Sequence, residues 1–315
     1  MLKGKSIVVT GGTGFIGSHL VKRLVKEGAL VNTLVRTTSD MNRIQEVADF
    51  VTTHVVDLTD REAVHTIMKT LKPDGIFHLA ALNQSYGVIP TASELLMGNT
   101  FATVNLMDAV DQMPYEFFVH TGTSVEVGPK DEPIRENHIC EPTEFYSISK
   151  LSATLYGQAL GRTKNKPIVA IRVFTPYGPY MQKGKIVTQL IEGALTTKEV
   201  KLSSKSVTRD FIYIDDLVDL LIGVSEHASD FPGEIFNGGT GIATELGSLV
   251  TMIETCTDTH IKALWSNSLA SYDQTKWQAD MTKVTTKLNW RPQVTLEEGI
   301  QKSVDWFTKH QDYWN

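Results

Sequence analysis

Near its start the chain reads Thr10-Gly11-Gly12-Thr13-Gly14-Phe15-Ile16-Gly17, directly after the apolar run Ser6–Thr10 and at the opening of a helical pattern over Ile16–Lys26. Such a turn needs glycine where φ is positive, where the backbone approaches a diphosphate, and where a helix lies close to a strand. The helix N-terminus then directs unpaired N–H groups and the positive end of its dipole at phosphate oxygens. A plain strand-to-helix turn would also contain glycine, but this context favours a dinucleotide site.

Short β-branched runs alternate with helix-length stretches over the first 175 residues. We predict strands buried on both faces at Ser6–Thr10, Leu30–Val35, Val51–Val56, Gly75–Leu79, Glu116–Thr121 and Pro167–Val173. We predict helices at Ile16–Lys26, Ser39–Val47, Asp60–Leu71, Ser93–Val110 and Phe145–Arg162, with Gly28 as a C-cap and Ser39 and Asp60 as N-caps. This alternation is typical of a Rossmann-type, doubly wound parallel sheet with helices on both faces.

After Gly178 the segments become shorter and are interrupted by proline and glycine. A strand is predicted at Glu199–Leu202, with helices at Asp215–Val224, Leu246–Thr255 and Leu296–Thr308. We therefore expect residues 1–178 to form an NAD(P)-binding α/β domain. Residues 179–315 should form mainly a smaller α/β substrate lobe, some of whose elements return to the first sheet.

Composition excludes several classes of function. The 315 residues are 41% hydrophobic and 21% charged, and the net charge of −6 gives no general attraction to nucleic acid or anionic membranes. No apolar run is long enough to cross a bilayer, and residues 1–10 do not form a signal-peptide pattern. Cys140 and Cys256 lack metal-site spacing; a bridge between them is conceivable, but two reduced thiols in a cytoplasmic protein are the expectation.

The residue after the second predicted strand indicates whether the site binds NAD or NADP. An NAD-selective site places Asp or Glu there, about 20 residues after the last glycine, to bind the ribose diol. This chain has Arg36, followed by Thr37, Thr38 and Ser39. A guanidinium with neighbouring hydroxyls suits a 2′-phosphate, so we predict NADP rather than NAD. Alternatively, Arg36 stacks on the adenine or faces solvent.

Two more strand ends are expected to line the cofactor. Asp57-Leu58 follows the third strand, where the carboxylate would accept a hydrogen bond from the adenine amine, although a helix-capping Asp explains it equally well. His78-Leu79-Ala80-Ala81 ends the fourth strand, where small residues let a dinucleotide cross the strand ends. We expect His78 itself to be a packed core histidine.

A second motif, Tyr146-Ser147-Ile148-Ser149-Lys150, lies on the helix after the fifth strand. Tyr146 and Lys150 are one turn apart and share a helix face. A neighbouring ammonium and a positive nicotinamide both favour phenolate, so we expect a lowered Tyr146 pKa and proton exchange with a substrate hydroxyl. Thr121-Gly122-Thr123-Ser124 ends the fifth strand with hydroxyls that could hold the substrate oxygen. Alone, this spacing is common on solvated helices; in a dinucleotide-binding chain it favours catalysis.

Together these motifs resemble the extended short-chain dehydrogenase/reductase family, in its nucleotide-sugar epimerase/dehydratase/reductase group. The resemblance runs almost from end to end. It also rests on Arg172-Val173-Phe174-Thr175-Pro176-Tyr177-Gly178-Pro179, Arg209-Asp210-Phe211-Ile212-Tyr213-Ile214-Asp215-Asp216, Ile235-Phe236-Asn237-Gly238-Gly239, Ala279-Asp280 and Leu288-Asn289-Trp290-Arg291-Pro292.

The resemblance implies a catalytic set of Thr123, Tyr146 and Lys150, without a metal. The cofactor contacts that it implies, together with those predicted above, are Gly11, Thr13, Gly14, Phe15, Ile16, Gly17, Arg36, Asp57, Leu58, Leu79, Ala80, Ala81, Tyr146 and Lys150.

It also implies substrate contacts and an assembly. Ser124 and Asn83 are expected beside the substrate, and Thr175 stands where many relatives carry an Asn that touches the sugar or phosphate. Arg209 would bind the nucleotide diphosphate; a structural ion pair with Asp215 or Asp216 is the alternative. A homodimer is expected through the long helices before and after the fifth strand.

Two departures from the family pattern narrow the reaction. The 4,6-dehydratases carry acidic residues directly after the catalytic Thr, where this chain has Ser124 and Val125. Glu126 is expected on an extended segment that points elsewhere, so a dehydratase is disfavoured. In addition, a second diphosphate-binding arginine of many relatives is missing from Ser268–Ser271, where Lys276 is the nearest substitute.

We therefore predict an NADPH-dependent reductase of a nucleotide-activated 4-keto-6-deoxy sugar, with hydride delivered to C4 and Tyr146 as proton donor. The alternative is an NAD(P)-dependent nucleotide-sugar 4-epimerase of the UDP-glucose/galactose type. A catalytically silent redox sensor on the same fold is a third hypothesis, against which the intact catalytic set argues. The loops Asn83–Val88, Met181–Lys185 and Lys201–Val207 leave the nucleotide base and the sugar unspecified.

Overall fold

The computed structural model describes residues 2–83, 89–196, 198–266 and 276–314. The chain divides into two compact units of three segments each. Unit 1 comprises Met1–Glu126, Pro142–Arg172 and Val218–Phe236, and unit 2 comprises Val127–Glu141, Val173–Leu217 and Asn237–Asn315. Where the sequence predicts one boundary after residue 178, the chain passes between the units after residues 126, 141, 172, 217 and 236.

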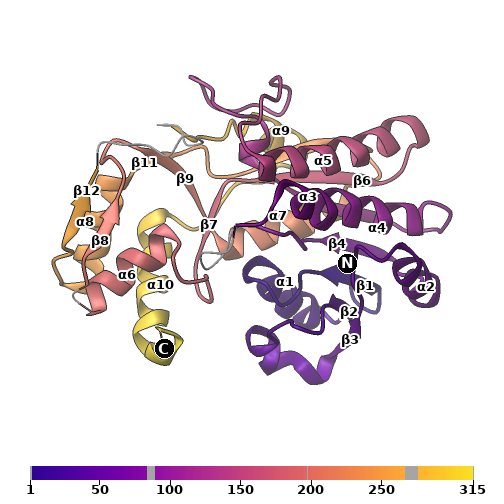
Figure 1. Cartoon of the computed structure of the whole chain (residues 1–315), viewed down its shortest axis with the longest axis horizontal. Helices are drawn as coiled ribbons and strands as arrows, with labels where there is room; N and C mark the ends of the chain where they lie inside the picture. The colour runs from indigo at the N-terminus through magenta and orange to yellow at the C-terminus, as the bar shows by residue number, and fades with distance from the viewer. Residues whose placement is uncertain (1, 84–88, 197, 267–275, 315) are drawn as a thin grey trace. The chain divides into compact units, whose positions relative to one another are not determined.

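Unit 1 is organised around a seven-stranded sheet of order β10-β6-β5-β4-β1-β2-β3 (Figure 1). The strands are β1 (Ser6–Thr10), β2 (Leu30–Val35), β3 (Val51–Val55), β4 (Gly75–His78), β5 (Phe117–Thr123), β6 (Ile168–Val173) and β10 (Ile235–Gly238). β1 pairs in parallel with β2 and β4, as do β2 with β3 and β4 with β5. The strand order reverses beside β1, which places the switch point of an open α/β sheet at the carboxyl ends of β1 and β4. The predicted doubly wound fold is confirmed.

β3 departs from the predicted burial on both faces. It is the edge strand of the sheet, and Thr52, Thr53 and Val55 are exposed. Val55 retains 62% of its accessible surface. The prediction is wrong because β-branched residues favour central and edge strands alike, so composition does not reveal which strand ends the sheet.

Helices cover both faces of this sheet. One face carries α2 (Arg61–Leu71), α4 (Ala102–Val110) and α5 (Phe145–Lys164), whose side chains join the strands in one apolar core that includes Val8, Ile76, Phe118, Met68, Leu106 and Leu160. The other face carries α1 (Phe15–Lys26) and α7 (Ile214–Glu226), joined by a 2.6 Å hydrogen bond from Arg23 to Asp219. The predicted N-cap Asp60 is confirmed, because it accepts from the Ala63 N–H at 3.0 Å. The C-cap of α1 is Glu27, and the predicted Gly28 follows it with φ of +81°.

Two segments predicted as α-helices contain other helix types. The segment predicted at Ser39–Val47 is a 3₁₀ helix, η1 (Asn42–Phe50), and Ser39 does not cap it, because its Oγ accepts from the Arg36 N–H at 3.0 Å instead. The long helix predicted at Ser93–Val110 consists of α3 (Ala92–Leu95), a π-helical segment η2 (Leu96–Phe101) and α4. π-helical turns are rare and recur at functional sites.

Unit 2 is a smaller α/β assembly. It holds the sheets β11-β9-β7 and β12-β8, built from β7 (Thr175–Tyr177), β8 (Val200–Leu202), β9 (Thr208–Tyr213), β11 (Ala243–Glu245) and β12 (Ala263–Trp265). Its helices include α6 (Ile186–Thr196), α8 (Leu246–Thr257), α9 (Thr282–Leu288), α10 (Leu296–Lys309) and η4 (Gln311–Trp314). In the described parts of the chain, no helix is both long and apolar enough to span a membrane.

Candidate active site

The turn after β1 shows why its glycines are needed. Gly11 has φ of +70°, and a Cβ there would lie 2.6 Å from the Ala80 backbone nitrogen. A Cβ on Gly17 would lie 2.1 Å from the Gly11 carbonyl oxygen, so glycine lets α1 start directly against the turn. Gly14 begins the helix with no side chain to cap it, and the first N–H groups of a helix lack partners within the helix. This uncapped N-terminus beside a bare turn fits the diphosphate of a dinucleotide.

A chain of hydrogen bonds leads from the end of β1 toward α4. The Thr10 Oγ1 accepts from the Ala80 N–H at 3.2 Å and lies 2.6 Å from the His78 Nδ1. The His78 Nε2 lies 2.8 Å from the Thr103 hydroxyl, which donates its proton to the Asn99 carbonyl at 2.6 Å. Because that hydroxyl has a single proton, the His78 Nε2 must be the donor to Thr103, and its Nδ1 accepts from Thr10. The network therefore assigns one neutral tautomer to His78.

Burial keeps His78 neutral. The side chain is fully buried, and this desolvation, with a smaller contribution from the Lys150 charge, lowers its pKa from 6.5 to about 3. Its ring stacks on His120 with centroids 5.5 Å apart. His78 is a packed core histidine, as predicted, and it orders the end of β4 from which Leu79, Ala80 and Ala81 continue.

Asn99, in η2, ties the segment after β4 to α5. Its Oδ1 accepts from the Leu82 N–H at 2.6 Å, and its Nδ2 donates to the Leu82 carbonyl and to the Ser149 hydroxyl, both at 2.9 Å. Ser149 in turn donates to the Tyr146 carbonyl at 2.8 Å. Sequence reasoning misses Asn99, because one polar residue in an apolar helical stretch resembles an ordinary surface position. The signal available was that Asn is a weak helix former.

Arg36 and Asp57 lie near one another, after β2 and β3. Hydrogen bonds from the Thr59 N–H (2.9 Å) and hydroxyl (2.8 Å) do most to lower the Asp57 pKa, and the Arg36 charge lowers it further. The helix cap is Asp60, so the helix-capping alternative for Asp57 is wrong. The Leu58 carbonyl accepts from the Asn105 Nδ2 at 3.0 Å, which holds this loop against α4. An exposed guanidinium and a fixed carboxylate thus stand together at this end of the sheet.

β5 ends at Thr123, which is partly exposed, and the chain turns into the 3₁₀ helix η3 (Ser124–Glu126). Ser124 is 6% exposed, so Thr123 is the more accessible of the two hydroxyls. Glu126 is fully buried, and its Oε1 accepts from the Thr123 N–H at 3.0 Å. The predicted extended segment is wrong: because the chain coils here, the Glu126 carboxylate folds back beneath the strand end.

Tyr146 and Lys150 occupy the first turns of α5. Lys150 is 2% exposed, whereas Tyr146 is partly exposed. Burial, and then the carboxylates of Glu126 and Glu144, raise the Tyr146 pKa well above its usual range. In the chain by itself the Tyr146 pKa therefore shifts upward, and the lowering that we predict beside a bound nicotinamide stays a prediction. Desolvation also lowers the Lys150 pKa from 10.5 to about 8, against an opposing contribution from Glu126.

The predicted substrate residues of unit 2 lie on its three-stranded sheet. Thr175 begins β7 and pairs with Phe211 of β9, and Arg209 lies in β9 opposite Thr244 of β11. Arg209 donates to the Thr208 carbonyl at 2.8 Å. Both residues are partly exposed.

Asp216, one of the two acids considered as a partner of Arg209, binds the backbone of the segment before α10. Its carboxylate accepts from the backbone N–H groups of Gln293 and Val294 at 3.1 and 3.0 Å. Lys185 is a further candidate that sequence reasoning did not single out. Burial lowers the pKa of its ammonium, and a desolvated cation suits an anionic ligand.

Some predicted features fall at or beyond the limits of the described chain. Asn83 is exposed and is the last described residue before residues 84–88 of the expected specificity loop. Ser268–Ser271, where the second arginine of many relatives is missing, lies outside the described residues. Among the residues that are described, no group of three His, Cys, Asp or Glu side chains is placed to hold a metal ion.

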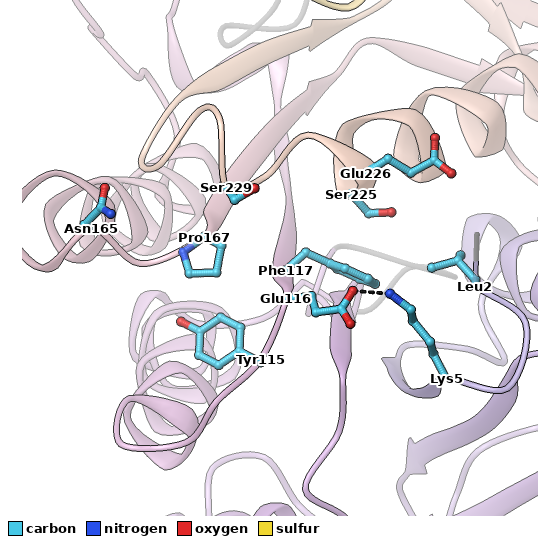
Figure 2. A pocket seen from close by; sticks show the side chains of 10 residues that line it. All are labelled: Leu2, Lys5, Tyr115, Glu116, Phe117, Asn165, Pro167, Ser225, Glu226 and Ser229. Atoms are coloured by element: carbon cyan, nitrogen blue, oxygen red, sulfur yellow. Dashed lines mark hydrogen bonds and ion pairs between the residues drawn. The ribbon is translucent and has the colours of Figure 1, made fainter.

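A cavity of about 420 Å³ lies elsewhere in unit 1 (Figure 2). Its lining includes Leu2, Phe117 and Pro167, and an ion pair between Lys5 and Glu116 crosses it. These residues stand at the amino ends of β1, β5 and β6. Ligands of doubly wound sheets bind at the carboxyl ends, so this cavity is distinct from the candidate site.

Comparison with known proteins gives consistent matches over both units. A model of the "NAD dependent epimerase/dehydratase family" matches residues 7–239. The dTDP-glucose 4,6-dehydratase of Neisseria meningitidis is 27% identical, over 98% of this chain and 95% of that one. The UDP-glucuronate 4-epimerase of Thermodesulfobacterium geofontis is 26% identical, over 95% of each chain. Among solved structures, UDP-glucose 4-epimerase of Thermotoga maritima with UDP-glucose is 25% identical, with a TM-score of 0.87 over 97% of this chain and 99% of that one.

Proposed function

Because the chain belongs to the NAD dependent epimerase/dehydratase family, as its motifs predict, we propose that it performs hydride chemistry at C4 of a nucleotide-activated sugar. The relatives named above act on dTDP- and UDP-linked sugars. Within this family, the reaction that we propose for this chain is NADPH-dependent reduction of a 4-keto-6-deoxy sugar nucleotide. Thr123, Tyr146 and Lys150 form the proposed catalytic set.

The reductase proposal rests mainly on the position of Arg36. It is exposed after β2, within a turn that Ser39 closes, where a 2′-phosphate would lie beside the adenosine ribose. A guanidinium stabilises that phosphate by a charge-assisted hydrogen bond, whereas a free diol needs an acceptor. Cells keep NADPH largely reduced, and an NADPH site therefore suits net reduction.

Each proposed catalytic residue has a separate task. When bound, the nicotinamide cofactor supplies the hydride. The Thr123 hydroxyl donates a hydrogen bond to the substrate carbonyl oxygen and holds it toward Tyr146. The Tyr146 phenol, which is protonated at neutral pH, donates its proton to that oxygen. The Lys150 ammonium then stabilises the phenolate that remains after the proton leaves.

Glu126 supports reduction rather than elimination. A 4,6-dehydratase needs acidic residues beside the catalytic Thr, and the η3 turn contains one acid only. That acid is fully buried, and its carboxylate is occupied by Thr123 and Arg172. A carboxylate held in this way is unavailable for proton transfer to the sugar.

The reductase proposal is tested by incubating the protein with NADPH or NADH and a panel of nucleotide-linked 4-keto-6-deoxy sugars while following cofactor oxidation. We expect NADPH consumption that falls about 10²- to 10⁴-fold in Tyr146→Phe. We expect Arg36→Asp to reduce the preference for NADPH over NADH about 10- to 100-fold, through loss of the charged hydrogen bond. Arg61→Asp, an exposed arginine on α2, is the matched control.

A 4-epimerase with tightly held cofactor is the second candidate. The printed description of the family names NAD, and two of the relatives are 4-epimerases. Interconversion of UDP-glucose and UDP-galactose without any NADPH consumption would establish this alternative and refute the reductase.

We also propose a homodimer formed through unit 1. Six apolar side chains on η2 and α5 are 38–65% exposed: Leu96, Met97, Phe101, Phe145, Ile148 and Leu155. These two segments pack against each other, so the side chains form one apolar face, which we call the η2–α5 face. Burying such a face in a second copy is favourable, because exposed apolar area is removed from water.

A further inference from the structure

Glu126 and Arg172 form an ion pair in the interior of unit 1, next to the proposed catalytic set. The Arg172 Nε lies 3.2 Å from the Glu126 Oε2, and the two side chains are 2% and 0% exposed. A buried ion pair costs desolvation energy and is often no more stable than an apolar pair of the same volume. A gain in stability is therefore a poor explanation for this ion pair. The hydrogen bonds that Glu126 makes to other elements offer a better one.

The Glu126 carboxylate connects three elements. Its Oε1 accepts from the Thr123 N–H at the end of β5, at 3.0 Å, and from the Thr154 hydroxyl on α5, at 3.1 Å. Its Oε2 accepts from Arg172 on β6. Gly122 provides the space, because a Cβ there would lie 2.5 Å from the Glu126 Oε1.

Thr154 stands one helical turn after Lys150 and two turns after Tyr146, so all three share one face of α5. A single carboxylate thus links the backbone of Thr123 to the helix face that bears the other two proposed catalytic residues. We propose that Glu126, anchored by Arg172, is a positioning residue that holds the Thr123 end of β5 against the Tyr146–Lys150 face of α5. This inference rests on the proposed function, which makes Thr123, Tyr146 and Lys150 one catalytic set.

The charge of Glu126 also shifts the pKa values of Tyr146 and Lys150. The titratable or charged groups around Lys150 and Glu126 are His78 (β4), His120 (β5), Arg172 (β6), and Glu144 and Tyr146 on α5 and its N-cap. Burial lowers the pKa of both histidines, so neither carries charge at neutral pH. Glu126 raises the pKa of Lys150 and of Tyr146. Its neutralisation should therefore move both titrations to lower pH.

Two substitutions of Glu126 separate the effect of its side-chain length from the effect of its charge. Glu126→Asp keeps the charge but is one methylene too short to reach Thr123, Thr154 and Arg172 together. Glu126→Gln keeps the length and removes the charge. If Glu126→Gln does not fold, kcat of Glu126→Asp decides the inference. Ile168→Val, a buried apolar change on β6, is the control for a general loss of stability.

The experiment has a kinetic and a spectroscopic measurement. We expect Glu126→Asp to lower kcat for NADPH oxidation about tenfold or more, with an unchanged Kd for NADPH, because misplacement of reacting groups is costly. The pH titration of Lys150 is followed by NMR in protein with ¹³C-labelled lysine and assigned with Lys150→Met. In Glu126→Gln we expect its midpoint to fall by about one pH unit or more. Ile168→Val should change neither quantity.

Wild-type kcat in Glu126→Asp, or an unmoved Lys150 titration in Glu126→Gln, overturns the inference. The proposed function fails separately, if the wild-type protein oxidises NADPH with none of the keto sugars. The Lys150 titration, which needs neither cofactor nor sugar, then decides the inference by itself.

Discussion

At the residue scale, folding buries the Lys150 ammonium, which in an unfolded chain is exposed to water. Burial lowers its pKa from 10.5 to about 8, so between these values the unfolded chain binds more protons than the folded one. Stability then rises with pH through this window, and the full cost of burying the ammonium is present below about pH 8.

Lys150→Met is expected to stabilise the protein at pH 7 by up to about 3 kcal/mol and to abolish turnover. The gain should shrink toward zero above about pH 10.5, where both states of the wild type carry a neutral lysine. Urea unfolding at pH 7 and at pH 10 measures it, with Lys69→Met, an exposed lysine on α2, as the control. A gain that is equal at both pH values would contradict the assignment of the cost to Lys150.

The site residues themselves differ in how far sequence predicts them. Type and spacing identify Tyr146 and Lys150, because one helical turn is a local geometry. The direction of the Tyr146 pKa shift in the chain by itself does not follow from the sequence, because it depends on desolvation and on Glu126, which reaches the site from another element. Asn99 and Arg172 escape sequence reasoning for the same reason: their partners are 17 to 50 residues away.

At the scale of the element, the helix before β5 depends on Asn99. The η2 segment brings this side chain to both backbone groups of Leu82 and to Ser149 of α5. Asn99→Leu would leave these buried groups unpaired, and we expect a loss of about 2–4 kcal/mol in the free energy of unfolding.

Thermal and urea unfolding test this expectation, and Gln112→Ala, an exposed change just beyond α4, serves as the control. The Tyr146 backbone is tied to the same network through Ser149, so kcat should fall as well. Stability equal to that of the control would show that the π-helical turn does not depend on this amide.

At the scale of the whole molecule, the η2–α5 face predicts the assembly. Phe101→Glu with Leu155→Glu places two charges on side chains that are already about half exposed, so the fold of the monomer should be retained. We expect the wild type to elute as a dimer in size-exclusion chromatography with light scattering, and the double variant to elute as a monomer.

Val55→Glu, at an apolar position of the edge strand β3 that is even more exposed, should leave the dimer intact. A wild type that is monomeric at micromolar concentration would refute the proposed assembly.

By itself the sequence determined the parallel sheet, six of its seven strands to within about two residues, the family and the type of cofactor turn. These features follow from local rules: apolar periodicity, glycine in a tight turn, and helix spacing. Tertiary structure alone decided that β3 is an edge strand, that η2 is π-helical, and that Glu126 faces inward to Thr123, Thr154 and Arg172. The physical reason is that burial and hydrogen bonds between distant segments exist only once the sheet has brought those segments together, and the charges that shift the pKa values of Tyr146 and Lys150 act only there.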